Sequence, residues 1–151
     1  MQKIGWIGVG IMGKAMVRNL MKAGYQLHIY ARHPEKVADV VSEGAVFHDS
    51  IADCVKASDV VITMVGFPKD VEEVYFTPGA ILDNAAKDTL LIDMTTTSPT
   101  LAKRIAEEGA QRGLRVLDAP VTGGDTGAKA GTLSILVGGQ RADFDTALPI
   151  F

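Results

Sequence analysis

The chain has 151 residues, of which 47% are apolar and 22% charged, so it is long enough for one domain with its own core and too apolar for wholesale disorder. A formal net charge of −3, without a concentration of Lys and Arg, argues against a nucleic-acid groove. The single cysteine has no partner for an internal disulfide or a metal site, and neither a signal peptide nor a membrane span is present, so we expect a soluble, cytoplasmic protein without bound metal.

Short apolar runs alternate along the chain with segments of helical period, as in βαβ units. The first half predicts, in order, a strand over Lys3–Val9, a helix over Met12–Lys22, a strand over Gln26–Tyr30, a helix over Glu35–Ser42, a strand over Val46–His48, a helix capped by Asp49 or Ser50 and running through Ala57, and a strand over Val60–Val65.

The second half continues the alternation until a glycine-rich loop interrupts it. It predicts a helix over Asp70–Phe76, a strand over Leu90–Asp93, a helix over Pro99–Arg112, a strand over Leu114–Ala119, a long loop over Pro120–Thr132, a strand over Leu133–Val137 and a final helical turn over Arg141–Ala147. The pattern predicts an α/β fold, an open, doubly wound and mostly parallel sheet of five to seven strands with helices on both faces.

The segment between the first strand and the first helix reads Gly8-Val9-Gly10-Ile11-Met12-Gly13. A G-x-G-x-x-G sequence in this position is the dinucleotide-binding fingerprint of the Rossmann fold. Gly8 permits the tight turn, Gly10 lets the backbone approach a pyrophosphate, and Gly13 allows the helix to pack closely on the strand. The free amides of the helix N-terminus would then face the anion. A glycine turn without a ligand is the alternative.

The end of the second strand bears on the choice of cofactor. An NAD-preferring site carries Asp or Glu there, on the ribose hydroxyls, whereas this chain continues Ala31-Arg32-His33. The guanidinium of Arg32 could bind a 2′-phosphate with two hydrogen bonds, and His33 and Lys36 add positive charge. The sequence therefore predicts NADP(H), with NAD(H) as the alternative, and counts against a methyltransferase. A solvated Arg32 at the strand end is the alternative.

Hydroxyl and glycine residues follow two later strands, in Thr95–Pro99 and Asp118–Gly124. Ligands of doubly wound sheets bind outside such strand ends, where these groups could hold a nicotinamide ribose and a carboxylate, although Thr and Gly also occur as ordinary turn residues. Gly123–Lys129 lacks the Gly-Lys-Ser/Thr ending of a nucleotide-hydrolysing phosphate loop. We expect structural or solvated roles for the histidines and a buried apolar role for the cysteine, namely His28, His33, His48 and Cys54.

Taken together, these segments resemble the β-hydroxyacid dehydrogenases, which include 3-hydroxyisobutyrate dehydrogenase and tartronate semialdehyde reductase. The matching stretches are Gly8–Leu20, Asp93–Thr96 and Asp118–Gly139, so the resemblance covers essentially the whole chain. It implies that Thr96 contacts the nicotinamide side of the cofactor. The residues that would line the adenosine-to-ribose path are Val65, Gly66 and Val71, and those that would hold the substrate carboxylate are Thr122, Gly123 and Gly124.

Members of that family also have a second, all-helical domain with the Lys that acts as general acid and base. No lysine of this chain lies in the corresponding motif, so we expect residues 1–151 to be the cofactor domain of a longer enzyme, with no catalytic residue of its own and inactive alone. The resemblance implies hydride transfer between NADP(H) and a small β-hydroxyacid or semialdehyde, and a homo-oligomer at full length. A non-catalytic dinucleotide-binding module and an imine reductase-like enzyme are the alternatives.

Overall fold

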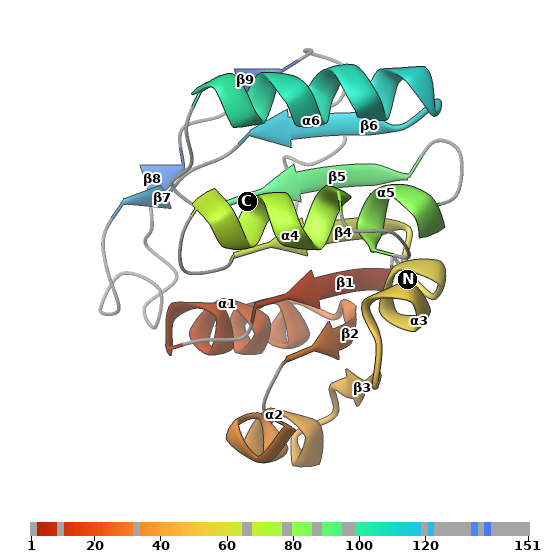
Figure 1. The fold of residues 1–151 in the computed structure, drawn as a ribbon. Helices are drawn as coiled ribbons and strands as arrows, with labels where there is room; N and C mark the ends of the chain where they lie inside the picture. Colours follow the sequence, from red (N-terminus) through yellow and green to blue (C-terminus); the bar gives the residue numbers. More distant parts are fainter. Residues whose placement is uncertain are drawn as a thin grey trace.

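A sheet of mostly parallel strands runs through the middle of the molecule and carries helices on both faces (Figure 1). The computed structural model describes residues 3–8, 11–31, 34–64, 68–76, 80–85, 89–94, 99–118, 121–122, 134–135 and 138–139. Within these ranges, seven strands form the main sheet in the order β3-β2-β1-β4-β5-β6-β9. They are β1 (Lys3–Ile7), β2 (Gln26–Tyr30), β3 (Val46–Phe47), β4 (Val60–Thr63), β5 (Leu90–Asp93), β6 (Arg115–Asp118) and β9 (Gly138–Gly139).

The strand order reverses in the middle of this sheet. From β1 the chain moves outward through β2 to β3, and it then returns to β4, which pairs with the other side of β1 and leads outward through β5 to β6. All neighbours from β3 to β6 are parallel, and β9 is antiparallel to β6. The predicted doubly wound, mostly parallel sheet is confirmed. Ligands of such sheets bind at the carboxyl ends of the strands beside the reversal, here β1 and β4.

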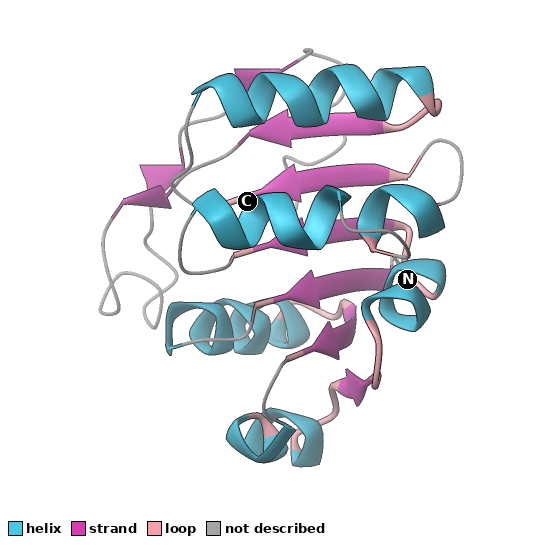
Figure 2. Cartoon of the chain, viewed as in Figure 1, coloured by secondary structure: helices cyan, strands magenta, loops and turns pink. Residues whose placement is uncertain are grey.

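The helices divide between the two faces (Figure 2). Buried residues of α1 and α2 share one apolar cluster, and those of α3, α4, α5 and α6 share the other. Their bounds are α1 (Ile11–Lys22), α2 (Ala38–Ser42), α3 (Ile51–Lys56), α4 (Pro68–Phe76), α5 (Ile81–Asn84) and α6 (Pro99–Gln111), with a short 3₁₀ turn, η1, at Pro34–Lys36.

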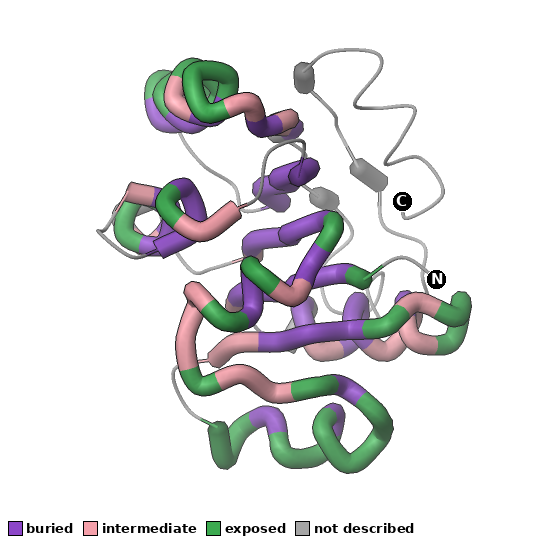
Figure 3. Tube along the Cα trace, turned by 90° about the vertical axis from the view of Figure 1, so that its right-hand side faces the viewer, coloured by how far each residue is buried: buried purple, intermediate pink, exposed green. Residues whose placement is uncertain are grey.

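Successive residues of a central strand contribute to opposite faces of the sheet, which explains why these strands read as unbroken apolar runs. In β1, Trp6 joins the cluster that includes Val17 of α1, whereas Ile7 joins the cluster that includes Val55 of α3. All these side chains are almost fully buried, and the strands of the sheet's middle are coloured as buried in Figure 3.

One helix of the first half differs from its prediction, and one open choice of cap is resolved. The predicted helix over Glu35–Ser42 is split into η1 and α2, because Val37 between them has a non-helical backbone with ψ of 9°. Val37 and Val40 are both fully buried in the core. Of the two predicted caps of α3, Asp49 and Ser50, the structure shows Ser50: its hydroxyl accepts a hydrogen bond from the Asp53 N–H at 3.2 Å.

The second half holds three departures. Helix α5 was not predicted, since its four residues are too short to show a helical period. The predicted loop over Pro120–Thr132 contains β7 (Val121–Thr122), which pairs antiparallel with β8 (Ser134–Ile135) in a separate small sheet. The strand predicted over Leu133–Val137 is therefore β8, outside the main sheet, whose edge is taken by β9. The helical turn predicted over Arg141–Ala147 lies outside the described residues.

Candidate functional site

The chain turns sharply where β1 ends. Gly8 follows the last residue of β1 and has a φ of 96°, in the left-handed region that favours glycine. Its N–H donates to the carbonyl oxygen of Tyr30, the last residue of β2, at 3.4 Å. The turn is thereby anchored to the carboxyl end of the neighbouring strand.

Gly13, in the first turn of α1, lies directly against this turn. A Cβ atom placed on Gly13 would stand 2.8 Å from the carbonyl oxygen of Gly8 and 3.1 Å from Nε1 of Trp6. The indole N–H of Trp6 also donates to the Gly8 carbonyl, at 3.4 Å. Because the nearest obstacle is a backbone atom, any side chain at position 13 would push α1 off the end of β1. The close packing predicted for Gly13 is therefore present.

This packing places the N-terminus of α1 beside the carboxyl ends of β1 and β2. The helix has 12 residues and no acidic side chain in its first turn. The first amides of a helix have no partner within it, so this positive dipole end favours an anion. A glycine-packed turn that brings helix amides close to a sheet edge fits the pyrophosphate of a dinucleotide. Gly8, Ile11, Met12 and Gly13 of the predicted site belong to this turn and helix.

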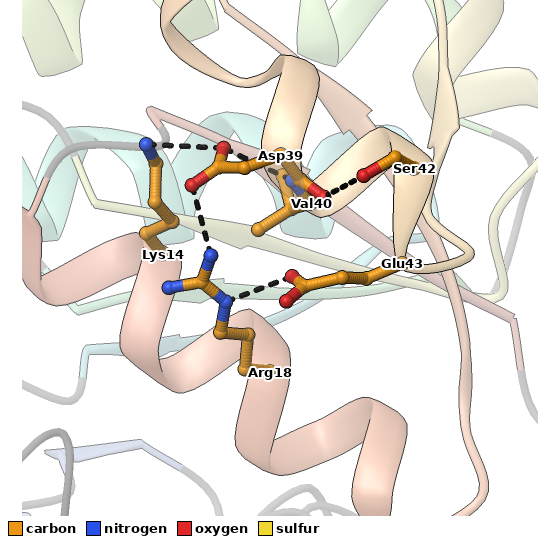
Figure 4. A network of polar contacts seen from close by, with 6 residues as sticks. All are labelled: Lys14, Arg18, Asp39, Val40, Ser42 and Glu43. Carbon is orange, nitrogen blue, oxygen red and sulfur yellow. Dashed lines mark hydrogen bonds and ion pairs between the residues drawn. The ribbon is translucent and has the colours of Figure 1, made fainter.

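A network of ion pairs joins α1 to α2 (Figure 4). Asp39 accepts from Nζ of Lys14 at 3.2 Å and from Nη2 of Arg18 at 2.8 Å. Arg18 also donates through Nε to Glu43 at 2.8 Å. The hydrogen bond to Glu43 raises the pKa of Arg18. Desolvation alone would raise the pKa of Asp39, but the bonds from Lys14, the Val40 N–H and Arg18 outweigh it and lower that pKa.

This network joins the segment after β2 to α1, the helix that follows the glycine turn at Gly8. Lys36, in η1, is exposed, and Ala31, directly after β2, is half-buried next to that turn. The sequence did not single out Lys14 or Arg18, although the spacing of four residues between them places both on one helix face.

A second polar group lies at the carboxyl ends of β4 and β5. The hydroxyl of Thr63 is 2.8 Å from the phenol oxygen of Tyr75 in α4 and 3.0 Å from Oδ1 of Asp93. All three residues are buried. Sequence reasoning missed this group. The available signal was a polar residue, Thr63 or Asp93, ending each of two otherwise apolar strands.

Of the remaining predicted site residues, Val71 and Thr122 lie in the described part of the chain and the others lie outside it. Val71 is fully buried in the core between α4 and the sheet, which accounts for its apolar character, and its contact with a cofactor stays a prediction. Thr122 lies in β7, in register with Ser134. The predicted residues that lie outside the described part of the chain are Val9, Gly10, Arg32, His33, Val65, Gly66, Thr96, Gly123 and Gly124.

His28 and His48 contact one another, with Nδ1 of the first 2.8 Å from Nε2 of the second. Desolvation lowers the pKa of His28, and the nearby charges of His48 and Lys3 lower it further. Cys54 is buried, and its thiol donates to the His28 carbonyl at 3.4 Å. In the described ranges no helix is long and apolar enough to cross a membrane, and no three His, Cys, Asp or Glu side chains are grouped to hold a metal ion.

A parallel sheet in this strand order, with a glycine-packed turn that opens a helix beside the reversal, defines an α/β dinucleotide-binding domain. The chain belongs to the family described as the NAD binding domain of 6-phosphogluconate dehydrogenase, whose family model matches residues 3–151. It is therefore a domain for a nicotinamide dinucleotide, as the sequence predicted.

Similar proteins support the same family. The chain is 49% identical over 148 residues to "Uncharacterized oxidoreductase YkwC" of Bacillus subtilis, covering 98% of this chain and 51% of that protein. It is 41% identical over 150 residues to 3-hydroxyisobutyrate dehydrogenase of Pseudomonas aeruginosa, covering 99% of this chain and 50% of that protein.

Among solved structures, 3-hydroxyisobutyrate dehydrogenase of Mycobacterium tuberculosis with L-serine matches with a TM-score of 0.93 at 34% identity, over 99% of this chain and 50% of that one. The predicted resemblance to the β-hydroxyacid dehydrogenases is confirmed. The chain spans about half the length of the relatives that it matches.

Proposed function

We propose that the protein binds NADP(H) and forms the cofactor domain of an oxidoreductase that acts on a small β-hydroxyacid or semialdehyde. The observation that carries this proposal is the packing of Gly13 against the Gly8 carbonyl, which sets the N-terminus of α1 at the carboxyl edge of the sheet. Membership of the family supports a nicotinamide cofactor, and the names of the relatives support a hydroxyacid as the substrate class.

Different residues of the chain would bind different parts of the dinucleotide. Amides at the start of α1 would hold the pyrophosphate, and the close packing of Gly13 on the Gly8 carbonyl keeps that end of the helix at the sheet edge. Arg32, with His33 and Lys36, would bind the 2′-phosphate, because no carboxylate competes for the ribose at the end of β2.

At the other end of the cofactor, Thr96 would contact the nicotinamide side, and the substrate carboxylate would be held by Thr122, Gly123 and Gly124. When bound, the nicotinamide supplies or accepts the hydride at its C4 atom. The role of these residues is to bring the substrate carbon to that position. We assign proton transfer to none of the 151 residues.

A fluorescence titration of the protein with NADPH and with NADH tests the proposal. We expect both to bind and NADPH to bind more tightly. In Arg32→Asp the NADPH affinity should fall by about 10- to 100-fold, since a charge-assisted hydrogen-bonded contact is lost and a repulsive charge is introduced. The preference should then reverse in favour of NADH.

Arg104→Asp is the matched control, because it makes the same change of charge at an exposed position of α6 that pairs with Glu72. It should leave the ratio of the two affinities unchanged. Failure of the wild-type protein to bind either dinucleotide contradicts the proposed function as a whole. Tighter binding of NADH by the wild-type protein contradicts the choice of NADP(H) and the assignment of Arg32, and it leaves the dinucleotide-binding domain in place.

A further inference from the structure

Three buried polar side chains from different elements are joined by hydrogen bonds at the carboxyl edge of the sheet. Thr63 is the last residue of β4, Asp93 is the last residue of β5, and Tyr75 lies in the last turn of α4. Their exposed fractions are 0%, 3% and 1%. A buried carboxylate and a buried phenol need hydrogen-bond partners, and apolar side chains would fill the same space without that requirement. Their presence therefore calls for a reason other than packing.

The hydrogen bonds among Tyr75, Thr63 and Asp93 have one donor-to-acceptor direction. The Thr63 hydroxyl has one proton and donates it to Oδ1 of Asp93 at 3.0 Å, because a carboxylate oxygen accepts more strongly than the Tyr75 phenol oxygen at 2.8 Å or the Ile92 carbonyl oxygen at 3.4 Å. With that proton donated to Asp93, the contact of 2.8 Å between the Thr63 and Tyr75 oxygens requires the phenol to donate. Tyr75 therefore donates to Thr63 and Thr63 to Asp93, and such chains of bonds strengthen one another.

The helix places the phenol at this edge. Side chains of a helix lean toward its N-terminus, and α4 begins at Pro68, soon after the carboxyl end of β4. Tyr75, although near the end of α4, can thus reach back to Thr63. The bonds fix α4 to both strand ends at once.

The same strand ends lead directly to the dinucleotide site. Thr63 is in register with Ile7, the residue before Gly8, and with Asp93 on its other side. Backbone bonds from the Met64 N–H to Ile7 at 2.9 Å and from the Met94 N–H to Thr63 at 2.8 Å continue this alignment one residue further. Thr96, three residues after the end of β5, is the residue that we assign to the nicotinamide side of the cofactor.

We propose that Tyr75, acting through Thr63 and Asp93, is a positioning residue for the nicotinamide half of the bound dinucleotide. This inference rests on the proposed function. The two hydrogen bonds would hold the ends of β4 and β5 in one arrangement, so that the residue assigned to the nicotinamide meets it without a further loss of conformational freedom. The pyrophosphate and the 2′-phosphate are assigned to the start of α1 and the end of β2, so a ligand without the nicotinamide should depend less on Tyr75.

The experiment compares two ligands, NADPH and 2′-phospho-ADP-ribose, which is the same molecule without the nicotinamide ring. Their dissociation constants are measured by calorimetry for the wild-type protein, Tyr75→Phe, Thr63→Val and Thr63→Ser. Tyr75→Phe and Thr63→Val remove one hydroxyl each and keep the apolar volume. We expect each substitution to raise the dissociation constant for NADPH by about 3- to 10-fold, the range for one hydrogen bond. The dissociation constant for 2′-phospho-ADP-ribose should change by less than about 2-fold.

Thr63→Ser keeps the hydroxyl and should retain the wild-type affinity for NADPH, which a mere loss of packing at Thr63 would not allow. Tyr25→Phe is the control, because Tyr25 precedes β2 at the opposite edge of the sheet and should change neither affinity. If Tyr75→Phe does not fold, the comparison of Thr63→Val with Thr63→Ser decides.

An equal loss of affinity for both ligands overturns the inference and assigns the three residues to the stability of the fold. Unchanged NADPH affinity in Tyr75→Phe and Thr63→Val overturns it as well. If the wild-type protein binds neither ligand, the proposed function fails and this inference fails with it, and that outcome is recognised because it appears before any substitution is made.

Discussion

The carbonyl oxygen of Gly8 lies 2.8 Å from the point where a Cβ atom of Gly13 would stand. The turn after β1 and the first turn of α1 are therefore in contact through their backbones. A helix this close to the strand end can present its amides to an anion at the sheet edge. The relationship allows the dinucleotide site to be tested at position 13 through the packing of α1.

Gly13→Ala should destabilise the fold and weaken dinucleotide binding together. Overpacking of this kind costs about 1–3 kcal/mol, and here the helix must shift because the backbone oxygen of Gly8 cannot rotate away. We expect at least a tenfold loss of affinity for NADPH, measured by fluorescence on samples shown to be folded by circular dichroism.

The matched control is Gly109→Ala in α6. A Cβ atom there would stand 2.6 Å from Cγ2 of Val116, close to the amino end of β6 and away from the dinucleotide edge. This variant should lose stability and keep its affinity for NADPH. Equal losses of affinity in both variants would mean that general destabilisation explains the effect of Gly13→Ala.

The contact between His28 and His48 predicts a dependence of stability on pH. Burial, together with the charges of His48 and Lys3, lowers the pKa of His28 in the folded protein below its unfolded value of about 6.5. Between the two values the unfolded chain binds more protons, so stability is greatest above about pH 6.5 and falls as the pH drops through that value. It should level off below the folded pKa.

The measurement is the thermal midpoint at pH 7.5 and pH 5.5 for the wild-type protein and for His28→Gln. Removal of the titrating ring should reduce the difference between the two pH values. The same difference in both proteins would assign the pH dependence to other groups.

Cys54 should be inert in the folded protein. It is fully buried, and desolvation raises the pKa of its thiol to about 12, against the opposing effect of a backbone hydrogen bond with Trp6. At pH 8 the thiolate is scarce and shielded, so a disulfide reagent such as Ellman's should react only after denaturant is added. Since the chain has one cysteine, the signal should then reach one thiol per chain. Rapid reaction without denaturant would contradict the burial of this side chain.

The ion pairs between α1 and α2 should contribute little, and only at low salt. Arg18, Asp39 and Glu43 are partly exposed, so solvent and ions screen their attraction. Arg18→Met should lower the thermal midpoint by at most a few degrees at low ionic strength, and the difference should vanish near 1 M NaCl, where the Debye length is about 3 Å.

Lys103→Met removes a longer pair, 3.9 Å to Glu107 within α6, and provides the comparison. We expect it to have a smaller effect than Arg18→Met, which loses bonds to two carboxylates of another helix. An effect of Arg18→Met that persists at high salt would show that packing of the Arg18 side chain, and not its charge, joins the helices.

Most of the sheet could be predicted from the sequence, because buried parallel strands read as short apolar runs between turns. The predicted ranges Gln26–Tyr30 and Leu90–Asp93 agree with β2 and β5 at both ends. The short elements α5 and β7 could not be predicted. The two residues of β7 are held by pairing with β8, and such pairing leaves no local pattern.

Some residues of the candidate site could likewise be predicted from the sequence, and others could not. Gly8 and Gly13 were found because their spacing in a single turn carries the information, and the structure supplies the contact that explains them. Thr63, Tyr75 and Asp93 were not found, because the bonds of Thr63 span 12 and 30 residues of sequence. No local spacing predicts such a contact.

By itself, the sequence determined the alternation of strands and helices, the glycine turn and its position before the first helix, since these depend on periodicity and on the backbone freedom of single residues. The tertiary structure decided which strand ends lie side by side, where the helix that begins at Pro34 breaks, and which polar side chains meet at the carboxyl edge. The physical reason is that burial and strand pairing act between residues far apart in the chain, and only the packed sheet brings those residues within hydrogen-bonding distance.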